Sequence, residues 1–329
     1  MFQFVYWLRA IAAVMITNAH YADIWPVSAL AFGGHFGNCI YFFLSGFCLY
    51  NIREPIYKWY FKRIIRIYPS LWIVSALNLL LNNGSIDTGI TGYIHCFLYP
   101  TWYHFIASIM LLYLAFYALR FLQSKFKIDT RIVAALLFAA FLAVYVFAFD
   151  KSYYHIDDVN EKWCRFMFAE SMLLGAISRE KYSEISEKIS PVHVVSIIAL
   201  GISYFIMKKA VSNISALAPI QFVMPVLVAS FIFSVALLFI KLEKRGFFEK
   251  INRYVKGVVK FTADISFEIY LCQNIIILYF AKKFAFPINF VVVTALIIVY
   301  AFLVNKAANL LRYPFKKVLK SSKNAEVHK

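Results

Sequence analysis

The sequence predicts an all-α membrane protein, a bundle of about ten transmembrane helices without a sizeable soluble domain. Of its 329 residues, 62% are hydrophobic and only 16% are charged, whereas soluble domains are about 45–50% apolar and about 25% charged. The apolar segments recur along the whole chain, and basic residues gather in every second gap between them. We therefore expect one membrane domain over residues 1–320 and a short cytoplasmic tail, 321–329, that is disordered.

Ten apolar segments are candidate membrane spans, since a helix needs about 17–25 residues to cross a bilayer and the segments come close to or reach this length. Their approximate bounds are 4–22, 36–52, 67–82, 102–120, 131–149, 163–178, 191–207, 220–240, 262–281 and 287–305.

The distribution of lysine and arginine predicts the orientation of the bundle. With the N-terminus inside, 26 of the 34 basic residues fall in inner segments, 7 fall at outer ends, and Arg9 lies within the first span. Short cytoplasmic loops carry such an excess. We expect both termini in the cytoplasm, and we attribute the net charge of +17 to topology, with the lipid bilayer and no nucleic acid as partner.

Ionisable side chains inside a span are costly, so each is a candidate functional residue. The first span holds Arg9 and His20, eleven residues apart, which share one helix face at a separation of about 16 Å. Histidine titrates near neutral pH, which suits His20 to general base catalysis. Alternatively, Arg9 reaches inner lipid headgroups and His20 caps the outer interface.

The segment 53–66 alternates aromatic and basic residues, which predicts a helix lying on the inner membrane surface. Arg63 and Arg66 share its face just before Pro69, where we expect the next helix to start. The planar guanidinium suits binding of phosphate. The alternative is an anchor on anionic lipid.

Two further polar features lie within spans. Ser45 and Gly46 stand in the middle of the second span, where small residues permit close helix packing and where no GxSxG elbow supports a nucleophile. Glu268 follows Asp264 by four residues, and the two could pair with an arginine, orient His20 or make salt bridges at a helix end. The histidines and cysteines show no metal-binding spacing, so we expect no metal.

These residues resemble the acyltransferase-3 family of bacterial membrane O-acyltransferases. The resemblance rests on Arg9, ten intervening residues and His20, then on FFLSGF at 42–47 and on Arg63-x-x-Arg66 before Tyr68 and a proline. It implies transfer of an acetyl group from acetyl-CoA, a substrate and not a bound cofactor, to a hydroxyl of a surface polysaccharide such as O-antigen, or of a lipid-linked glycan. It also implies a place in the bacterial inner membrane.

The resemblance also implies roles for individual residues. His20 is the expected general base, or a transient acyl carrier, with Arg9 in the same catalytic set, and Arg63 and Arg66 are expected to hold the phosphates of CoA. The residues expected to line the site are Ser45, Tyr68, Trp102 and Glu268.

The chain also departs from the family pattern. Gln273 stands near a place where many members have a histidine, Arg312 precedes Pro314 where many have an acid, and 102–113 lacks the acid of many fourth spans. An alternative function is that of an exporter or flippase for a glycan or lipid-linked sugar, whose path the polar helix face would line.

Overall fold

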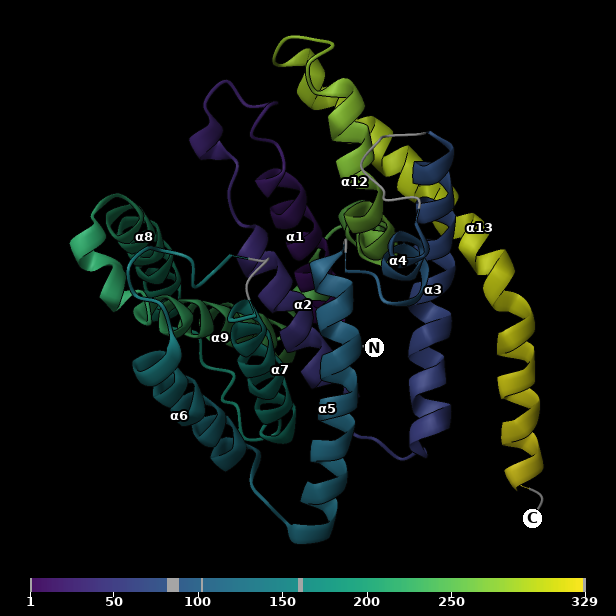
Figure 1. Ribbon diagram of the computed structural model, residues 1–329. Coiled ribbons are helices and arrows are strands. Elements are labelled where there is room, and N and C mark those ends of the chain that lie inside the picture. The colour runs from purple at the N-terminus through teal and green to yellow at the C-terminus, as the bar shows by residue number, and fades with distance from the viewer. Residues whose placement is uncertain (1, 82–88, 102, 159–161, 328–329) are drawn as a thin grey trace. The chain divides into compact units, whose positions relative to one another are not determined.

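The computed structural model describes residues 2–81, 89–101, 103–158 and 162–327, with side chains as far as Phe315. These residues form α-helices and short helical turns without any β-strand, which confirms the all-α prediction (Figure 1). The α-helices are α1 (Gln3–Ala19), α2 (Gly34–Leu49), α3 (Ile56–Leu80), α4 (Ile90–Tyr93), α5 (His104–Phe126), α6 (Thr130–Ala148), α7 (Cys164–Glu180), α8 (Pro191–Asn213), α9 (Val223–Lys244), α10 (Phe247–Lys250), α11 (Arg253–Asp264), α12 (Ser266–Phe280) and α13 (Ile288–Val327).

A helix lies over each of the ten segments that were predicted to span the bilayer. Within the described residues, α5, α6, α8, α9 and the part of α13 over Ile288–Phe315 are individually long and apolar enough to do so. α11 and α12 meet the same requirement together and are bent by 69°, as in a broken span or a re-entrant loop. The chain is therefore a multi-pass membrane protein, while the count of ten spans stays a prediction.

The chain divides into two compact units. The first contains Met1–Ile16, Gly33–Ile52 and Leu111–Ala263, and the second contains Thr17–Phe32, Arg53–Met110 and Asp264–Lys329. α1 therefore begins in the first unit and ends in the second. The expectation of one domain with a short tail stays a prediction.

In the first unit, α2 and α7 pack backbone against backbone. A Cβ atom added at Gly46 would overlap the carbonyl oxygen of Met172, and one added at Gly175 would overlap the carbonyl oxygen of Phe43. Each glycine thus contacts the backbone of the opposite helix. Such a close approach is possible only because glycine has no side chain. Close packing, the interpretation that the sequence favoured for Gly46, is what the structure shows.

The start of α1 is capped by a carboxylate from α9. Glu243 accepts hydrogen bonds from the backbone N–H groups of Gln3 and Phe4, each at 2.9 Å. The first N–H groups of a helix lack partners within it and carry the positive end of its dipole. Glu243 therefore fixes the first turn of α1 within the first unit.

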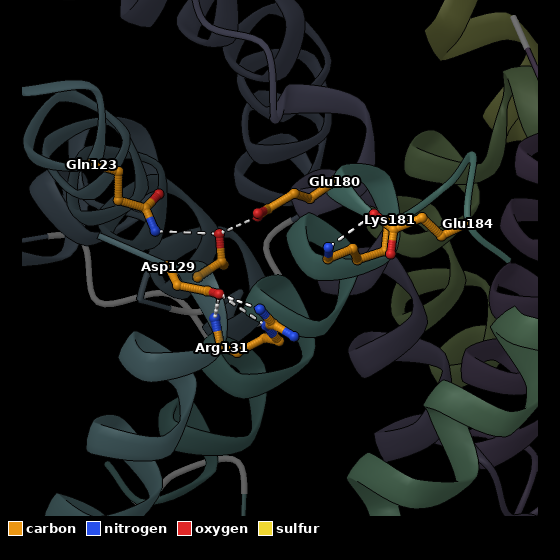
Figure 2. A network of polar contacts seen from close by, with 7 residues as sticks. Gln123, Asp129, Arg131, Glu180, Lys181 and Glu184 are labelled. Atoms are coloured by element: carbon orange, nitrogen blue, oxygen red, sulfur yellow. Dashed lines mark hydrogen bonds and ion pairs between the residues drawn. The ribbon is translucent and has the colours of Figure 1, made fainter. Parts of the chain in front are cut away.

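The turn between α5 and α6 is held by a polar network (Figure 2). Asp129 caps α6, accepting from the backbone N–H of Arg131 at 2.8 Å, and its carboxylate pairs with the Arg131 guanidinium. These hydrogen bonds lower the pKa of Asp129 to about 2. Thr130 donates to Glu180 of α7 at 2.7 Å and accepts from Gln123 of α5 at 3.3 Å, so the turn joins three helices.

In the second unit, α3 runs without a break from Ile56 to Leu80, with Pro69 inside it. The expectation that Pro69 starts a separate helix after a surface segment is therefore wrong. Proline lacks an N–H, so the carbonyl of Ile65, four residues earlier, loses its partner within the helix. Arg312 of α13 donates to this carbonyl oxygen from Nε at 3.3 Å. The helix continues through the proline with an external donor at this carbonyl.

Candidate functional site

Arg9 and His20 lie at different depths of α1 and belong to different units. Arg9 is half-buried in the first unit, and its backbone carbonyl accepts a hydrogen bond from Tyr41 at 3.2 Å. His20 follows the last helical residue and is exposed, in a turn closed by its N–H and the carbonyl of Thr17 at 3.0 Å. An exposed imidazole at a helix end can exchange a proton with a bound substrate.

The segment after His20 is fixed by hydrogen bonds within the second unit. Asn18 donates to the carbonyls of Leu30 and Phe32 at 2.8 and 3.0 Å, and its own side-chain oxygen accepts from Trp25 at 2.9 Å. The hydroxyl of Tyr21 bonds that of Thr294 in α13 at 2.9 Å. His20 thus sits between two anchored residues, which holds its backbone in place.

One helical turn before His20, α1 contacts α12 through two polar side chains. Thr17 donates to Oε1 of Gln273 at 2.9 Å. Gln273 is fully buried, and its Nε2 has no hydrogen-bond partner among the described residues. A buried amide donor without a partner is costly and rare in folded proteins. Gln273 therefore has a hydrogen-bond donor to spare near the end of α1 that carries His20.

The two arginines predicted to bind phosphate have different surroundings on α3. The guanidinium of Arg63 lies over the ring of Trp59, with 4.5 Å between its central carbon and the ring centroid, and is half-buried. The side chain of Arg66 is exposed, while its backbone carbonyl accepts from Arg312 at 2.7 Å. The helix thus presents one guanidinium held on an aromatic ring and one that reaches outward.

A buried charged cluster supports this part of α3. Arg312 Nη2 lies 2.6 Å from Ser70 Oγ and 3.3 Å from Glu268 Oε1, and Ser70 donates to the same carboxylate oxygen at 2.6 Å. The side chains of Arg312 and Glu268 are 9% and 2% exposed. A carboxylate this deeply buried requires such a partner. Glu268 therefore pairs with an arginine, one of the roles the sequence left open.

α12 connects the arginine segment to the end of α1 inside the second unit. Glu268 meets the Arg312 cluster on α3 and α13, and Gln273 meets Thr17. The two α12 residues are five positions apart, about 7.5 Å along a helix axis. Among the described residues, five of the predicted site residues lie in this unit: His20, Arg63, Arg66, Tyr68 and Glu268.

The residues predicted to line the site, apart from Glu268, make no side-chain hydrogen bond to this cluster that the described part of the chain shows. Ser45 is half-buried on α2 in the first unit. Tyr68 donates to the carbonyl of Leu98 at 2.7 Å, so its hydroxyl holds the turn after α4. Trp102 lies outside the described residues.

Sequence reasoning missed the contacts of two residues that the structure brings forward. From the sequence, Arg312 counted as inner positive charge and as a departure from the family pattern, and Gln273 only as such a departure. The signal available for Arg312 was Pro69, because a proline within a helix leaves a carbonyl that needs a donor. Nothing in the sequence paired Gln273 with Thr17, since 256 positions separate them.

Comparison with known proteins gives one family. No curated protein and no solved structure matches the chain. A family model described as an acyltransferase domain matches residues 2–305, nearly the whole length. On that match, the helical membrane protein that carries Arg9, His20 and the buried Arg312 cluster belongs to the acyltransferase-3 family.

Proposed function

We propose that this membrane acyltransferase transfers an acetyl group from acetyl-CoA to a hydroxyl of a bacterial surface polysaccharide or lipid-linked glycan, with His20 as general base. Arg63 and Arg66 bind the phosphates of the donor, and Arg9 adds positive charge from the same helix as the base. The enzyme lies in the bacterial inner membrane with both termini in the cytoplasm, where the donor is found.

The reaction needs one proton acceptor and one charged anchor. The acceptor hydroxyl oxygen attacks the thioester carbonyl carbon while the imidazole of His20 takes the hydroxyl proton. The carbon–sulfur bond then breaks, and the proton passes from His20 to the sulfur of the leaving CoA. Gln273 Nε2 donates a hydrogen bond to the carbonyl oxygen as negative charge develops there.

The observation that supports this proposal most is the pair of contacts made by α12. Glu268 joins the segment that carries Arg63 and Arg66, and Gln273 joins α1 one turn before His20. A donor anchored by its phosphates on α3 would have to bring its thioester toward this end of α1. The buried amide of Gln273, with a hydrogen to donate, fits a carbonyl oxygen there.

The test is label transfer by the purified protein in detergent. With acetyl-labelled acetyl-CoA and a glycan acceptor, the wild type should place label on the glycan. His20→Ala should lower the rate by about 10²–10⁴-fold, the effect of removing a positioned base. A folded His20→Ala variant with normal transfer would refute the role of His20.

The donor site has its own test. Arg63→Ala with Arg66→Ala should weaken binding of acetyl-CoA, and the matched pair Lys125→Ala with Lys127→Ala, two basic residues at the end of α5 and in the turn after it, should leave it unchanged. Equal affinity in both double variants would refute the phosphate role. An exporter would instead move glycan across a membrane and place no label on it.

A further inference from the structure

A small pocket lies in the first unit and contains none of the residues proposed for acyl transfer. It has a volume of about 210 Å³ and is formed between the start of α1 and α11. Its walls are Gln3, Tyr6 and Trp7 from α1 and Lys256, Gly257, Val259 and Lys260 from α11. Two lysines and two aromatic residues thus line one cavity, and no acidic residue is among the lining residues.

Neighbouring contacts hold the two sides of this pocket. Trp7 stacks on Phe248 of α10, with 5.5 Å between ring centroids. Lys256 donates to the carbonyl of Glu249 at 3.1 Å, one of the three hydrogen bonds that an ammonium can make. The ammonium of Lys260 lies 5.9 Å from the ring centroid of Tyr6. The pocket is positively charged and suits an anion.

The face of α11 that lies opposite the pocket indicates the source of this anion. Tyr254, Val255, Val258 and Phe261 are exposed, two of them by 69% and 65%. Positions 254, 258 and 261 follow the helical spacing of one face, while the lysines line the pocket. A helix with an apolar face and a basic face lies at the membrane interface, its apolar side chains among the acyl chains.

We propose that the pocket binds the phosphate of an anionic phospholipid headgroup, with the exposed apolar residues of α11 lying in the same leaflet. Lys256 and Lys260 supply the positive charge that binds the phosphate. Tyr6 and Trp7 form the aromatic wall of the pocket at the membrane interface. Gly257 has no side chain, which leaves room for the headgroup. This site goes beyond the acyl-transfer reaction.

Gly257 permits a direct test of the cavity. A Cβ atom added there would meet nothing within 4 Å, so the backbone accepts a side chain at this position without overlap at Cβ. Gly257→Leu should fill the pocket and lower the binding of phosphatidylglycerol, whereas Gly257→Ala should leave binding near the wild-type value. Equal binding by the two variants would overturn the proposal.

The role of the two lysines is tested with two matched double variants. Each is reconstituted in nanodiscs of phosphatidylcholine that contain a titrated fraction of phosphatidylglycerol. Lys256→Gln with Lys260→Gln should weaken retention of phosphatidylglycerol, read by native mass spectrometry, by on the order of tenfold or more. Lys250→Gln with Arg253→Gln removes the same charge beside the pocket but outside its lining. Equal losses in the two pairs would overturn the proposal, because the effect would then be general surface attraction.

The source of the phosphate is decided by competition. Free CoA and inorganic phosphate are added separately to the nanodisc sample. Retention of phosphatidylglycerol should not change with either. Displacement by CoA or by phosphate at a concentration near that of the protein would show a soluble ligand in the pocket and would overturn the assignment to lipid. Because the readout is bound lipid, failure here is distinct from failure of acyl transfer.

Discussion

Among single residues, Arg312 makes the most varied set of contacts around the candidate site. Its guanidinium meets two backbone carbonyls of α3, the hydroxyl of Ser70 and the carboxylate of Glu268. Arginine suits this position because its planar group offers five donors in fixed directions. The same side chain therefore neutralises a buried acid and supplies the donor that Pro69 cannot.

Removing one member of this pair should be more harmful than removing both. Arg312→Met leaves the Glu268 carboxylate buried without its cation, a loss that costs about 3–5 kcal/mol of unfolding free energy. Arg312→Met with Glu268→Met removes both charges and should cost less than Arg312→Met alone. Unfolding in detergent micelles, followed by tryptophan fluorescence, gives these free energies. A double variant whose loss equals the sum of the single losses would contradict the pairing.

Gln273 is expected to act on the reaction more than on donor binding. Gln273→Leu should lower kcat by about 10²–10³-fold, as when a donor to a developing oxyanion is removed. The KM for acetyl-CoA should change little, because the bond strengthens only in the transition state. Steady-state kinetics of label transfer measures both. If Gln273 only supports Thr17, then Thr17→Val should lower kcat equally, and the donor role fails.

The packing of α2 against α7 gives a prediction about whole elements. Gly46→Ala or Gly175→Ala forces a methyl group into the opposite backbone, so each should destabilise the first unit by about 1–3 kcal/mol or more. Gly201→Ala is the matched control, because its Cβ would meet a Phe231 ring carbon at an ordinary 3.5 Å. Thermal unfolding in detergent compares the three. Equal melting temperatures would mean that α2 and α7 lie farther apart.

The cap of α6 predicts a dependence on pH. The pKa of Asp129 is lowered from 3.8 to about 2, so its cap is fully present above about 4 and is lost as pH falls through 2. Hydrogen exchange of the first-turn amides of α6 should be slower in the wild type than in Asp129→Ala at pH 6. The difference should shrink as pH falls through 2 and vanish below it. A difference that persists there would contradict the carboxylate cap.

For the whole molecule, the predicted topology can be tested with reporter fusions. Alkaline phosphatase fused after Asn213, at the predicted outer end of α8, should be active, and the same enzyme fused after Lys250 should be inactive. The reason is that the phosphatase folds only outside the cytoplasm, while the basic segment 241–260 is predicted to stay inside. The reverse pattern would exclude the cytoplasmic N-terminus.

The helices of this protein could be predicted from the sequence because a bilayer allows few alternatives to long apolar helices. The same reasoning found Arg9, His20, Arg63, Arg66 and Glu268 as polar exceptions. It could not find the contacts of Arg312 or Gln273, because they join segments far apart in the chain. It also misread Pro69, since the donor that lets α3 continue comes from another helix.

The contact between Ile65 and Arg312 spans 247 positions of sequence, which has a consequence for biosynthesis. At about 5–20 residues per second, the ribosome reaches Arg312 roughly 12–50 s after it has made Ile65. Throughout that interval the carbonyl of Ile65, four residues before Pro69, cannot bind its native donor, although α3 has already left the ribosome. Until Arg312 is made, water or another donor must satisfy the carbonyl of Ile65, so this part of α3 reaches its native hydrogen bonding only after α13 has been synthesised.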